Sequence, residues 1–257
     1  MKRFFASLSF LRLLFIPIIK FFNFSFKWKH DITTRDFFLE TYYHKGYWYY
    51  GKARELMELK FFNENVKEGD IILEVGAHIG YLSQIFEDLI GEKGQLAVIE
   101  PAPENLVYLK QNTLSRTKLI NKAVSDYKGE SEFYIENFGG FTNSLSYEFT
   151  KSNNEQHQKS QNVNSKITPI KIKVDTIDNI CQELSIKPNF IKIDVEGLEH
   201  KALIGSQETL KIVEFIMVEI TRNKEEILKL LKSYKFELIN YDNTTGNYFF
   251  KKNLKNN

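Results

Sequence analysis

The sequence predicts an α/β fold in which helices cover both faces of a doubly wound, mostly parallel sheet that ends in an antiparallel hairpin. Three observations support this prediction. Residues 70–80 read D-I-I-L-E-V-G-A-H-I-G, an apolar run followed by a glycine turn, which is typical of a central parallel strand leading into a helix. Strand-like and helix-like segments then alternate five times, and two short strand-like runs flank residues 243–246 as a closing hairpin. Folds with this order bind ligands at the carboxyl ends of their strands.

The glycine turn is the feature around which the other segments are arranged. Gly76 and Gly80 lie four residues apart, so the backbone can turn tightly and a ligand can approach where a Cβ atom would collide. The first free N–H groups of the following helix face that ligand. Glu74 lies inside the apolar strand, where a carboxylate without partners is costly to bury. We therefore expect Glu74 to order the glycine turn or to accept a hydrogen bond from the ligand.

Charge and cysteine content argue against several classes of protein. The formal net charge is +2, and six Lys and Arg residues precede the first acidic residue, Asp31. The remainder is slightly acidic, which argues against a nucleic-acid-coating domain. Cys181 is the single cysteine, so one chain can form neither a disulfide framework nor a cysteine metal cluster. We expect a cytoplasmic protein in which Cys181 has a packing role.

Residues 1–35 form a basic, aromatic amino-terminal segment. Arg12 and Pro17 interrupt its apolar run, which is shorter than the roughly 20 residues that span a bilayer. No small-residue cleavage site of a signal peptide follows the run. Two interpretations stay open. Residues 1–30 lie peripherally on the anionic face of the cytoplasmic membrane, or they pack as a helix on the catalytic domain.

Residues 36–66 are expected to form a helical cover for the domain that occupies residues 67–252. This cover is rich in aromatic side chains, namely Tyr42, Tyr43, Tyr47, Trp48, Tyr49 and Tyr50. The cluster can stack on a sugar or lipid acceptor, or it can cover an apolar sheet edge, and the sequence leaves both open. Within the domain, the polar run 150–166 is predicted to be a mobile loop, because its low hydrophobicity cannot support a packed core.

Two segments after the glycine turn indicate a nucleoside site. A helix is expected over 81–90 and a second strand over 95–100. Glu100 ends that strand about 20 residues beyond the turn, where doubly wound folds place the carboxylate that binds the ribose hydroxyls. A third strand is expected over 119–125. Its end, at Ala123 and Val124, is where an adenine ring would lie in such a fold.

The other elements follow from periodicity and turn residues. Pro101 and Pro103 introduce a helix, since proline is favoured in a first helical turn. Further strands are expected at 131–136, 170–174, 190–195, 213–220, 236–241 and 248–251, and further helices at 175–184, 198–210 and 225–232.

The glycine spacing favours one class of cofactor. Three residues separate Gly76 from Gly80, so the turn lacks the G-x-G-x-x-G spacing that a dinucleotide pyrophosphate requires. An adenosyl cofactor without a pyrophosphate requires less. An acid inside the first strand, a single glycine turn and an acid at the end of the second strand fit S-adenosylmethionine better.

Four blocks of the sequence carry a resemblance to a known family. They are E-V-G-A-H-I-G-Y at 74–81, I-E-P-A-P-E-N at 99–105, V-D-T-I-D at 174–178 and I-K-I-D-V-E-G-L-E at 191–199. These blocks resemble the FkbM-type methyltransferases, a branch of the class I, Rossmann-like enzymes that use S-adenosylmethionine. The resemblance covers residues 68–220 and implies a seven-stranded sheet. It also implies O-methylation of a hydroxyl on a sugar, glycan or secondary metabolite.

The resemblance and the spacing together indicate the cofactor site. By the resemblance, Glu74, Gly76 and Gly80 surround the methionine end of the cofactor and Glu100 binds the ribose. One departure is His78, where many members have Asn. The residues expected to bind the cofactor are Glu74, Gly76, Ala77, His78, Gly80, Tyr81, Glu100, Pro101, Ala123, Val124 and Asp194.

Carboxylates at the ends of the fourth and fifth strands are the candidates for catalysis. Methyl transfer is an in-line displacement, so the protein mainly aligns the acceptor oxygen and helps it lose a proton. Asp194 is expected to contact the cofactor's amino group, and Glu196 to take the acceptor proton or to share a divalent cation with Asp194. Glu219 lies on the same edge, and His200 serves as a base if its ring turns toward the crevice. The structural alternatives are helix capping by the acids and a solvated His200.

Two rival functions are weighed against this one. Tyr147 and Lys151 with Ser144 nearby mimic the catalytic set of a short-chain dehydrogenase that uses NAD, but chance produces that spacing easily in a chain with 13 Tyr. The other rival is a methyltransferase-like scaffold without activity. Retention of Glu74, Gly80, Glu100 and Asp194 together argues against it.

Overall fold

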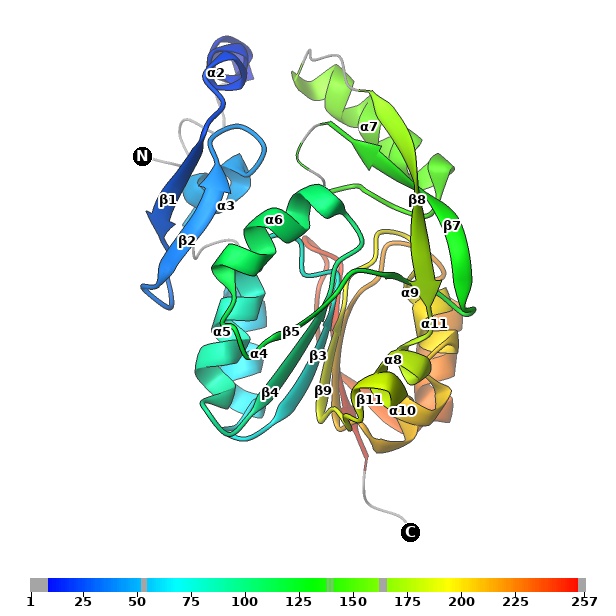
Figure 1. Ribbon diagram of the computed structural model, residues 1–257. Coiled ribbons are helices and arrows are strands. Elements are labelled where there is room, and N and C mark those ends of the chain that lie inside the picture. The colour runs from blue at the N-terminus through cyan, green and yellow to red at the C-terminus, as the bar shows by residue number, and fades with distance from the viewer. Residues whose placement is uncertain (1–8, 52–54, 138, 140, 162–165, 254–257) are drawn as a thin grey trace.

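A seven-stranded sheet forms the centre of the protein (Figure 1). The computed structural model describes residues 9–51, 55–137, 139, 141–161 and 166–253. The strand order is β11-β12-β10-β9-β3-β4-β5. The parallel strands are β3 (Ile71–Val75), β4 (Gln95–Ile99), β5 (Lys118–Ile120), β9 (Phe190–Ile193) and β10 (Phe215–Glu219), and the closing antiparallel hairpin is β11 (Phe236–Asp242) and β12 (Asn247–Lys252). The predicted fold class is confirmed.

Helices cover both faces of this sheet because its central strands bury side chains on both sides. In β3, Ile72 belongs to one core cluster and Leu73 to the other, as expected when successive residues point to opposite faces. The first face carries α4 (Leu56–Asn65), α5 (Tyr81–Ile90) and α6 (Pro103–Asn112). The second carries α8 (Ile177–Leu184), α9 (Glu199–Ile204), α10 (Gln207–Ile212) and α11 (Lys224–Ser233) (Figure 1).

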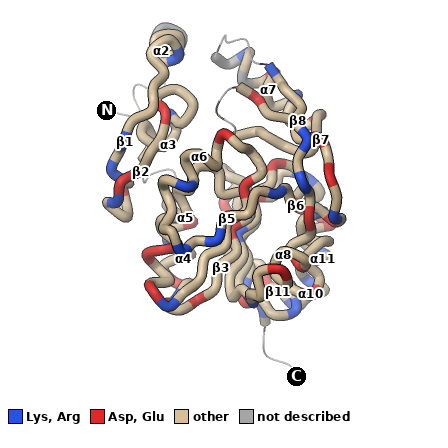
Figure 2. The backbone as a smooth tube through the Cα atoms, viewed as in Figure 1, with Lys and Arg blue, Asp and Glu red and all other residues tan. Residues whose placement is uncertain are grey.

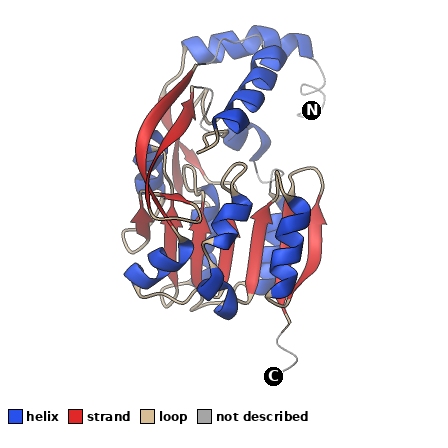
Figure 3. Cartoon of the chain, turned by 90° about the vertical axis from the view of Figure 1, so that its right-hand side faces the viewer, coloured by secondary structure: helices blue, strands red, loops and turns tan. Residues whose placement is uncertain are grey.

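Two arms rise above the carboxyl ends of the parallel strands (Figures 1 and 3). The amino-terminal arm comprises α2 (Ser9–Phe21), β1 (Ser25–Lys29), β2 (Asp36–Glu40) and α3 (Lys45–Tyr50), and β1 pairs antiparallel with β2. The β7–α7 arm comprises β7 (Gly129–Glu136), α7 (Tyr147–Gln161) and β8 (Ile167–Asp175), and β7 pairs antiparallel with β8 as predicted. The space between these arms and the sheet holds the site described below.

The largest departure from the predictions is α7. The prediction of a loop over 150–166 is wrong as far as residue 161, and residues 162–165 lie outside the described residues. Phe149, Thr150 and Asn154 are buried, at a spacing that one face of a helix satisfies. The Thr150 hydroxyl also donates to the Thr142 carbonyl at 3.0 Å. A few buried residues thus support a helix whose overall composition is polar.

Three other boundaries differ from the expectations. The cover at 36–66 is not wholly helical, because it begins with β2. The strand expected at 119–125 is divided between β5 and the short strand β6 (Ala123–Val124), which pairs with β8 in a separate sheet. The helix expected at 198–210 breaks at Gly205, where an added Cβ would lie 2.3 Å from the Ser125 carbonyl oxygen.

Candidate active site

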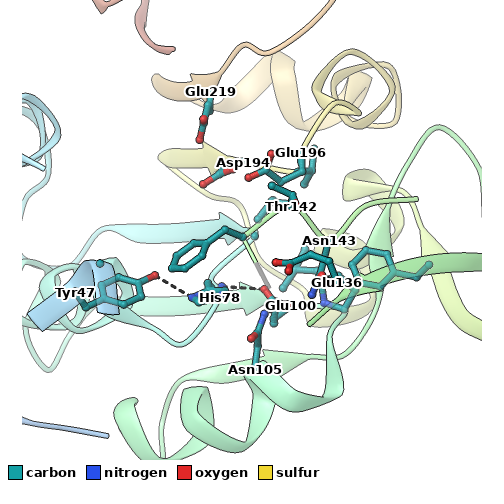
Figure 4. Close-up of a pocket in the computed structure, with 18 of the residues that line it drawn as sticks. Tyr47, His78, Glu100, Asn105, Glu136, Thr142, Asn143, Asp194, Glu196 and Glu219 are labelled. Atoms are coloured by element: carbon teal, nitrogen blue, oxygen red, sulfur yellow. Dashed lines mark hydrogen bonds between the residues drawn. The ribbon is translucent and has the colours of Figure 1, made fainter. Parts of the chain in front are cut away.

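A cavity of about 760 Å³ lies at the carboxyl ends of the parallel strands and is also lined by both arms. Its volume is within the range typical of small-molecule sites. The structure brings together around it most of the residues that the sequence indicated, namely Gly76, His78, Glu100, Pro101, Ala123, Val124, Asp194, Glu196 and Glu219. Figure 4 shows the side chains of Asp194 and Glu196, which follow β9, near that of Glu219 at the end of β10.

The glycine turn closes one side of the cavity. Gly76 has φ 81°, and an added Cβ would lie 1.7 Å from the Asp194 carbonyl oxygen. Only glycine therefore allows the ends of β3 and β9 to approach this closely. Gly80 has φ 88° and serves the turn differently, because it packs against the Leu109 side chain of α6 rather than lining the cavity.

His78 connects the glycine turn with both arms. Its backbone has φ 51°, a conformation uncommon outside glycine. Its ring nitrogens lie 2.9 Å from the Tyr47 hydroxyl and 2.9 Å from the Gly139 carbonyl oxygen, and the ring stacks on Phe141. These contacts account for the hydrogen bonding that the sequence left open at this position.

Glu100 is held rigidly at the end of β4. Its carboxylate accepts hydrogen bonds from the backbone N–H of His78 at 2.8 Å, from the N–H of Ala102 at 3.0 Å and from the Asn105 amide at 3.0 Å (Figure 4). Burial outweighs these donors and raises the pKa of Glu100 to about 7. A buried carboxylate at this strand end can accept hydrogen bonds from a vicinal diol.

Ala123 and Val124 provide an apolar surface beside Glu100. Both are buried, and β6 holds them in place by pairing with Val174 and Asp175 of β8. Pro101 lines the same part of the cavity. A flat apolar ring can lie against this surface while its polar substituent meets Glu100.

A buried lysine organises the acids on the opposite side. Lys192 lies in β9 directly across from Glu74 in β3, so opposite charges face each other inside the sheet. Its ammonium group donates to the Gly76 carbonyl at 2.7 Å and lies 3.1 Å from a carboxylate oxygen of Asp194. Lys192 thus ties the glycine turn to Asp194.

Glu219 and Glu196 complete the acidic group. Burial and the neighbouring Asp194 and Glu196 carboxylates raise the pKa of Glu219 well above its usual range, and Asp194 is also its hydrogen-bond partner. Burial and Asp194 likewise raise the pKa of Glu196. Three carboxyl groups this close cannot all ionise easily, so the group retains protons at neutral pH.

The backbone of Glu196 is strained. Its φ is 50°, and the Ser144 hydroxyl donates to its carbonyl oxygen at 2.7 Å. The next residue, Gly197, donates its N–H to the buried Glu199 carboxylate at 2.7 Å. Residues held in such conformations by their surroundings gather at functional sites, and this one lies in the cavity wall.

The remaining predicted residues lie elsewhere. Glu74, Ala77 and Tyr81 line a second, polar cavity of about 380 Å³, which shares Gly76, His78, Asp194 and Glu219 with the first. Within it, burial raises the pKa of Glu74 to about 7, and the Ser83 hydroxyl donates to Glu74 at 2.5 Å. Glu74 therefore connects β3 to the helix that follows the glycine turn.

The His200 ring does not turn toward the cavity, which was the condition for its serving as a base. It lies in the first turn of α9 and lines neither cavity. The preceding Glu199 is the residue that turns inward, where Thr221 also donates to it at 3.2 Å. Consecutive helical residues point in directions about 100° apart, so the His200 ring points elsewhere.

Several residues of the site were missed by sequence reasoning. They are Asn105, Glu136, Thr142 and Lys192. Lys192 had a detectable signal, because a charged residue inside the apolar run F-I-K-I is as unusual as Glu74 inside its own strand. Of the other three, Asn105 lies in α6, and Glu136 and Thr142 belong to the β7–α7 arm, where no local pattern marks them.

The alternative catalytic set is not assembled at the cavity. Tyr147 is 43% exposed and, like Lys151, lines neither cavity, while Ser144 is engaged with the Glu196 carbonyl. Within the described part of the chain, no group of three His, Cys, Asp or Glu side chains is arranged to hold a metal ion. Searching the same residues finds no helix with the length and apolar character needed to cross a membrane.

Comparison with known proteins gives a consistent result. The family model of the methyltransferase FkbM domain matches residues 74–238. The chain is 27% identical over 184 residues to the 2-O-methyltransferase NoeI of Sinorhizobium fredii, covering 67% of this chain and 74% of that protein. It is 35% identical over 72 residues to the protein-L-isoaspartate O-methyltransferase of Methanococcus aeolicus, 27% of this chain and 33% of the relative. Among solved structures it is similar to precorrin-6y C5,15-methyltransferase of Geobacter metallireducens, with a TM-score of 0.44, 8% identity and coverage of 78% and 86%.

Proposed function

Because the chain belongs to the methyltransferase FkbM domain family, we propose that it methylates a hydroxyl group of a sugar, glycan or secondary metabolite. The chain is an S-adenosylmethionine-dependent methyltransferase, and the NAD-dependent alternative is not favoured. The observation that carries the proposal is that one cavity brings together the Gly76 turn, Glu100 and the carboxyl groups of Asp194, Glu196 and Glu219. One end of that cavity suits an adenosyl group and the other suits a proton transfer.

The residues present fit S-adenosylmethionine. Glu100 would accept hydrogen bonds from the ribose hydroxyls, and Ala123 with Val124 would pack against the adenine. The acidic second cavity beside Gly76 would receive the methionine end, whose ammonium group suits Glu74 and Asp194. When bound, the cofactor supplies a methyl group on a positively charged sulfur.

The acids at the strand ends would prepare the acceptor. In this proposal the strand-end acids would hold an acceptor hydroxyl beside the place of the methyl group that bound S-adenosylmethionine would supply, with S-adenosylhomocysteine as the leaving group. The hydroxyl proton passes to the Glu196 carboxylate. A positive charge in the cavity favours the ionised form of nearby carboxyl groups, so Glu196 becomes available as a base when the cofactor site is filled. Glu219 would help to hold the acceptor in place.

Two experiments test the activity. Isothermal titration calorimetry should detect binding of S-adenosylhomocysteine, and NAD should give no heat. Incubation with radiolabelled S-adenosylmethionine and a panel of glycosides should give products heavier by one CH₂ unit. Binding of NAD without binding of S-adenosylhomocysteine would overturn the proposal. Cofactor binding combined with labelling of amines alone would overturn the hydroxyl acceptor.

We place the protein in the cytoplasm with peripheral contact to anionic membrane through the amino-terminal arm. Four aromatic side chains there are exposed to solvent, and we call them the aromatic strip: Phe21, Phe22, Phe24 and Trp28. Lysines flank the strip (Figure 2), although Lys27 and Lys29 also pair with Asp36. Such a surface suits a headgroup layer better than bulk water.

Point variants test this contact without removing α2, which also lines the cavity. Replacing Phe21 and Phe22 by Ser should reduce co-sedimentation with vesicles that contain phosphatidylserine. Binding of S-adenosylhomocysteine should stay unchanged, because neither residue lines a cavity. Undiminished co-sedimentation would exclude the aromatic strip as the contact.

A further inference from the structure

The roof of the large cavity is apolar. Phe15, Ile16 and Ile19 of α2 line the same cavity as the strand-end acids. Their spacing in sequence places them along one side of the helix. Ile18 is not part of the cavity lining, so α2 presents a distinct face to the cavity. No polar side chain of α2, over its residues with described side chains, is in the cavity lining.

The side chains that line the cavity change from acidic at the sheet to apolar at α2. Asp194, Glu196 and Glu219 lie at the strand ends, whereas α2 lies at the top of the molecule with α3 below it (Figure 1). The aromatic residues of α3 line the cavity between these limits, namely Tyr47, Trp48, Tyr49 and Tyr50. A molecule that fills the cavity therefore meets carboxyl groups at one end and apolar side chains at the other.

A buried hydroxyl at the polar end has no partner of its own. The Thr142 side chain is 7% exposed and lines the cavity, and its hydroxyl forms no hydrogen bond with the described residues. Figure 4 shows Thr142 beside Glu196. Because burying an unsatisfied hydroxyl is costly, a ligand that pairs with it gains binding energy. A hydroxylated head group provides such a partner.

The charges in the wall disfavour an anionic ligand. The two lysines of the large cavity's lining are already engaged, since Lys122 pairs with Asp175 at 2.8 Å and Glu183 at 2.7 Å, and Lys45 lies over the Tyr42 ring. The carboxyl groups outnumber these cations in the lining. A phosphate or carboxylate placed there would meet these acids and would find both lysines of the lining already engaged.

From these observations we propose that the acceptor is an uncharged amphiphile. Its hydroxylated head lies beside Glu196 and Thr142, and its apolar chain lies against Phe15, Ile16 and Ile19 of α2. This inference rests on the proposed function and adds to it the class of acceptor. Covering the apolar face of α2 removes hydrocarbon surface from water, so the chain contributes affinity that a free sugar lacks.

The test compares two acceptors that differ only in the apolar chain, n-octyl β-D-glucopyranoside below its micelle concentration and methyl β-D-glucopyranoside. The first measurement is calorimetric binding of each glycoside to protein saturated with S-adenosylhomocysteine. The second is methyl transfer from radiolabelled S-adenosylmethionine. We expect the octyl glycoside to be favoured in binding and in kcat/KM by at least about tenfold, the gain when two methylene groups leave water.

Variants of α2 locate the effect. Ile19→Ser should remove most of the preference for the octyl glycoside and leave binding of S-adenosylhomocysteine unchanged. Ile18→Ser makes the same change one residue away on the exposed side, and it should keep the full preference. Phe15→Ser provides a second cavity variant in case Ile19→Ser does not fold, because Phe15 is 55% exposed.

The possible outcomes distinguish failure of this inference from failure of the proposed function on which it rests. Failure to bind S-adenosylhomocysteine would remove the proposed function itself. Equal use of both glycosides would leave the methyltransferase intact and overturn the amphiphile, assigning the α2 face to packing within the chain. Binding of S-adenosylhomocysteine with neither glycoside bound or methylated would also overturn it. An octyl preference that Ile18→Ser and Ile19→Ser reduce equally would place the chain elsewhere.

Discussion

The sheet side and the arm side of the cavity are constructed differently. On the sheet side, charged groups are buried and held by several short contacts each, as Glu100 is by three donors and Lys192 by Gly76 and Asp194. At the cavity floor the polar contacts of the arms are fewer: Tyr47 and the Gly139 carbonyl meet the His78 ring, and the Ser144 hydroxyl donates to the Glu196 carbonyl. The chemistry is therefore fixed by the sheet, while the surface that meets the acceptor can change without disturbing it.

This difference predicts that substitutions on the sheet side have the larger effects, and Gly76→Ala should have the largest. The new Cβ would lie 1.7 Å from the Asp194 carbonyl oxygen, and that backbone cannot move without displacing β9. We expect a loss of about 3 kcal/mol or more in the free energy of unfolding, together with loss of cofactor binding. Urea denaturation and calorimetry measure the two effects.

Gly69→Ala is the matched control for this collision. Gly69 has φ 90°, close to the 81° of Gly76, but nothing lies within 4 Å of an added Cβ. Gly69→Ala should lower the free energy of unfolding by only about 1–2 kcal/mol, because alanine is strained in the left-handed backbone conformation. Equal losses in the two variants would show that strain rather than close approach makes Gly76 necessary.

The acids offer the next largest contrast. Glu196→Gln removes the proposed base and should lower kcat by about 10²–10⁴-fold with little change in the affinity for S-adenosylhomocysteine. Glu219→Gln should lower kcat by less than about tenfold, because glutamine resembles the protonated carboxyl that the raised pKa of Glu219 favours. The opposite order of effects would exchange the roles of these two residues.

Glu100→Ala should have an intermediate effect, on affinity rather than on turnover. Loss of a charged hydrogen-bond acceptor should weaken binding of S-adenosylhomocysteine by about 1–3 kcal/mol, measured by calorimetry. Glu92→Ala, at an exposed acid that lines neither cavity, is the control. An unchanged affinity in Glu100→Ala would exclude Glu100 from the cofactor site.

Because the pKa of Glu100 is raised, both the stability of the free protein and its binding of S-adenosylhomocysteine should depend on pH. Burial raises that pKa from 4.5 to about 7, so the free protein should lose stability as pH rises between these values, because the unfolded carboxyl ionises first. Ribose hydroxyls favour the ionised form, and binding of S-adenosylhomocysteine should therefore strengthen as pH rises through 7. Glu100→Gln should abolish this dependence. Glu74→Gln separates the contribution of the other acid whose pKa is about 7.

The difference between the sheet side and the arm side of the cavity also explains how much of each side the sequence predicted. The sheet was predictable because its signals are local: the run around Ile72, the turn at Gly76 and the acid at Glu100 are read within one strand–helix unit. In α7 the helix depends on a few buried residues such as Phe149 and on packing against β7, which no local pattern reveals. Lys192 was missed for another reason, since its partner Glu74 is distant in sequence and adjacent only in the sheet.

Tyr47→Phe should have the smallest effect and tests the arm side directly. It removes one hydroxyl that lies 2.9 Å from a His78 ring nitrogen and leaves the ring packing between Phe37 and Tyr81 in place. We expect a loss of about 0.5–1.5 kcal/mol in binding of S-adenosylhomocysteine, the net value of one hydrogen bond. Tyr127→Phe, at a tyrosine that is 41% exposed, is the control. A loss above about 3 kcal/mol, larger than the range expected for Glu100→Ala, would mean that the amino-terminal arm contributes to cofactor binding as much as the sheet does, and the two sides of the cavity would then act as one unit.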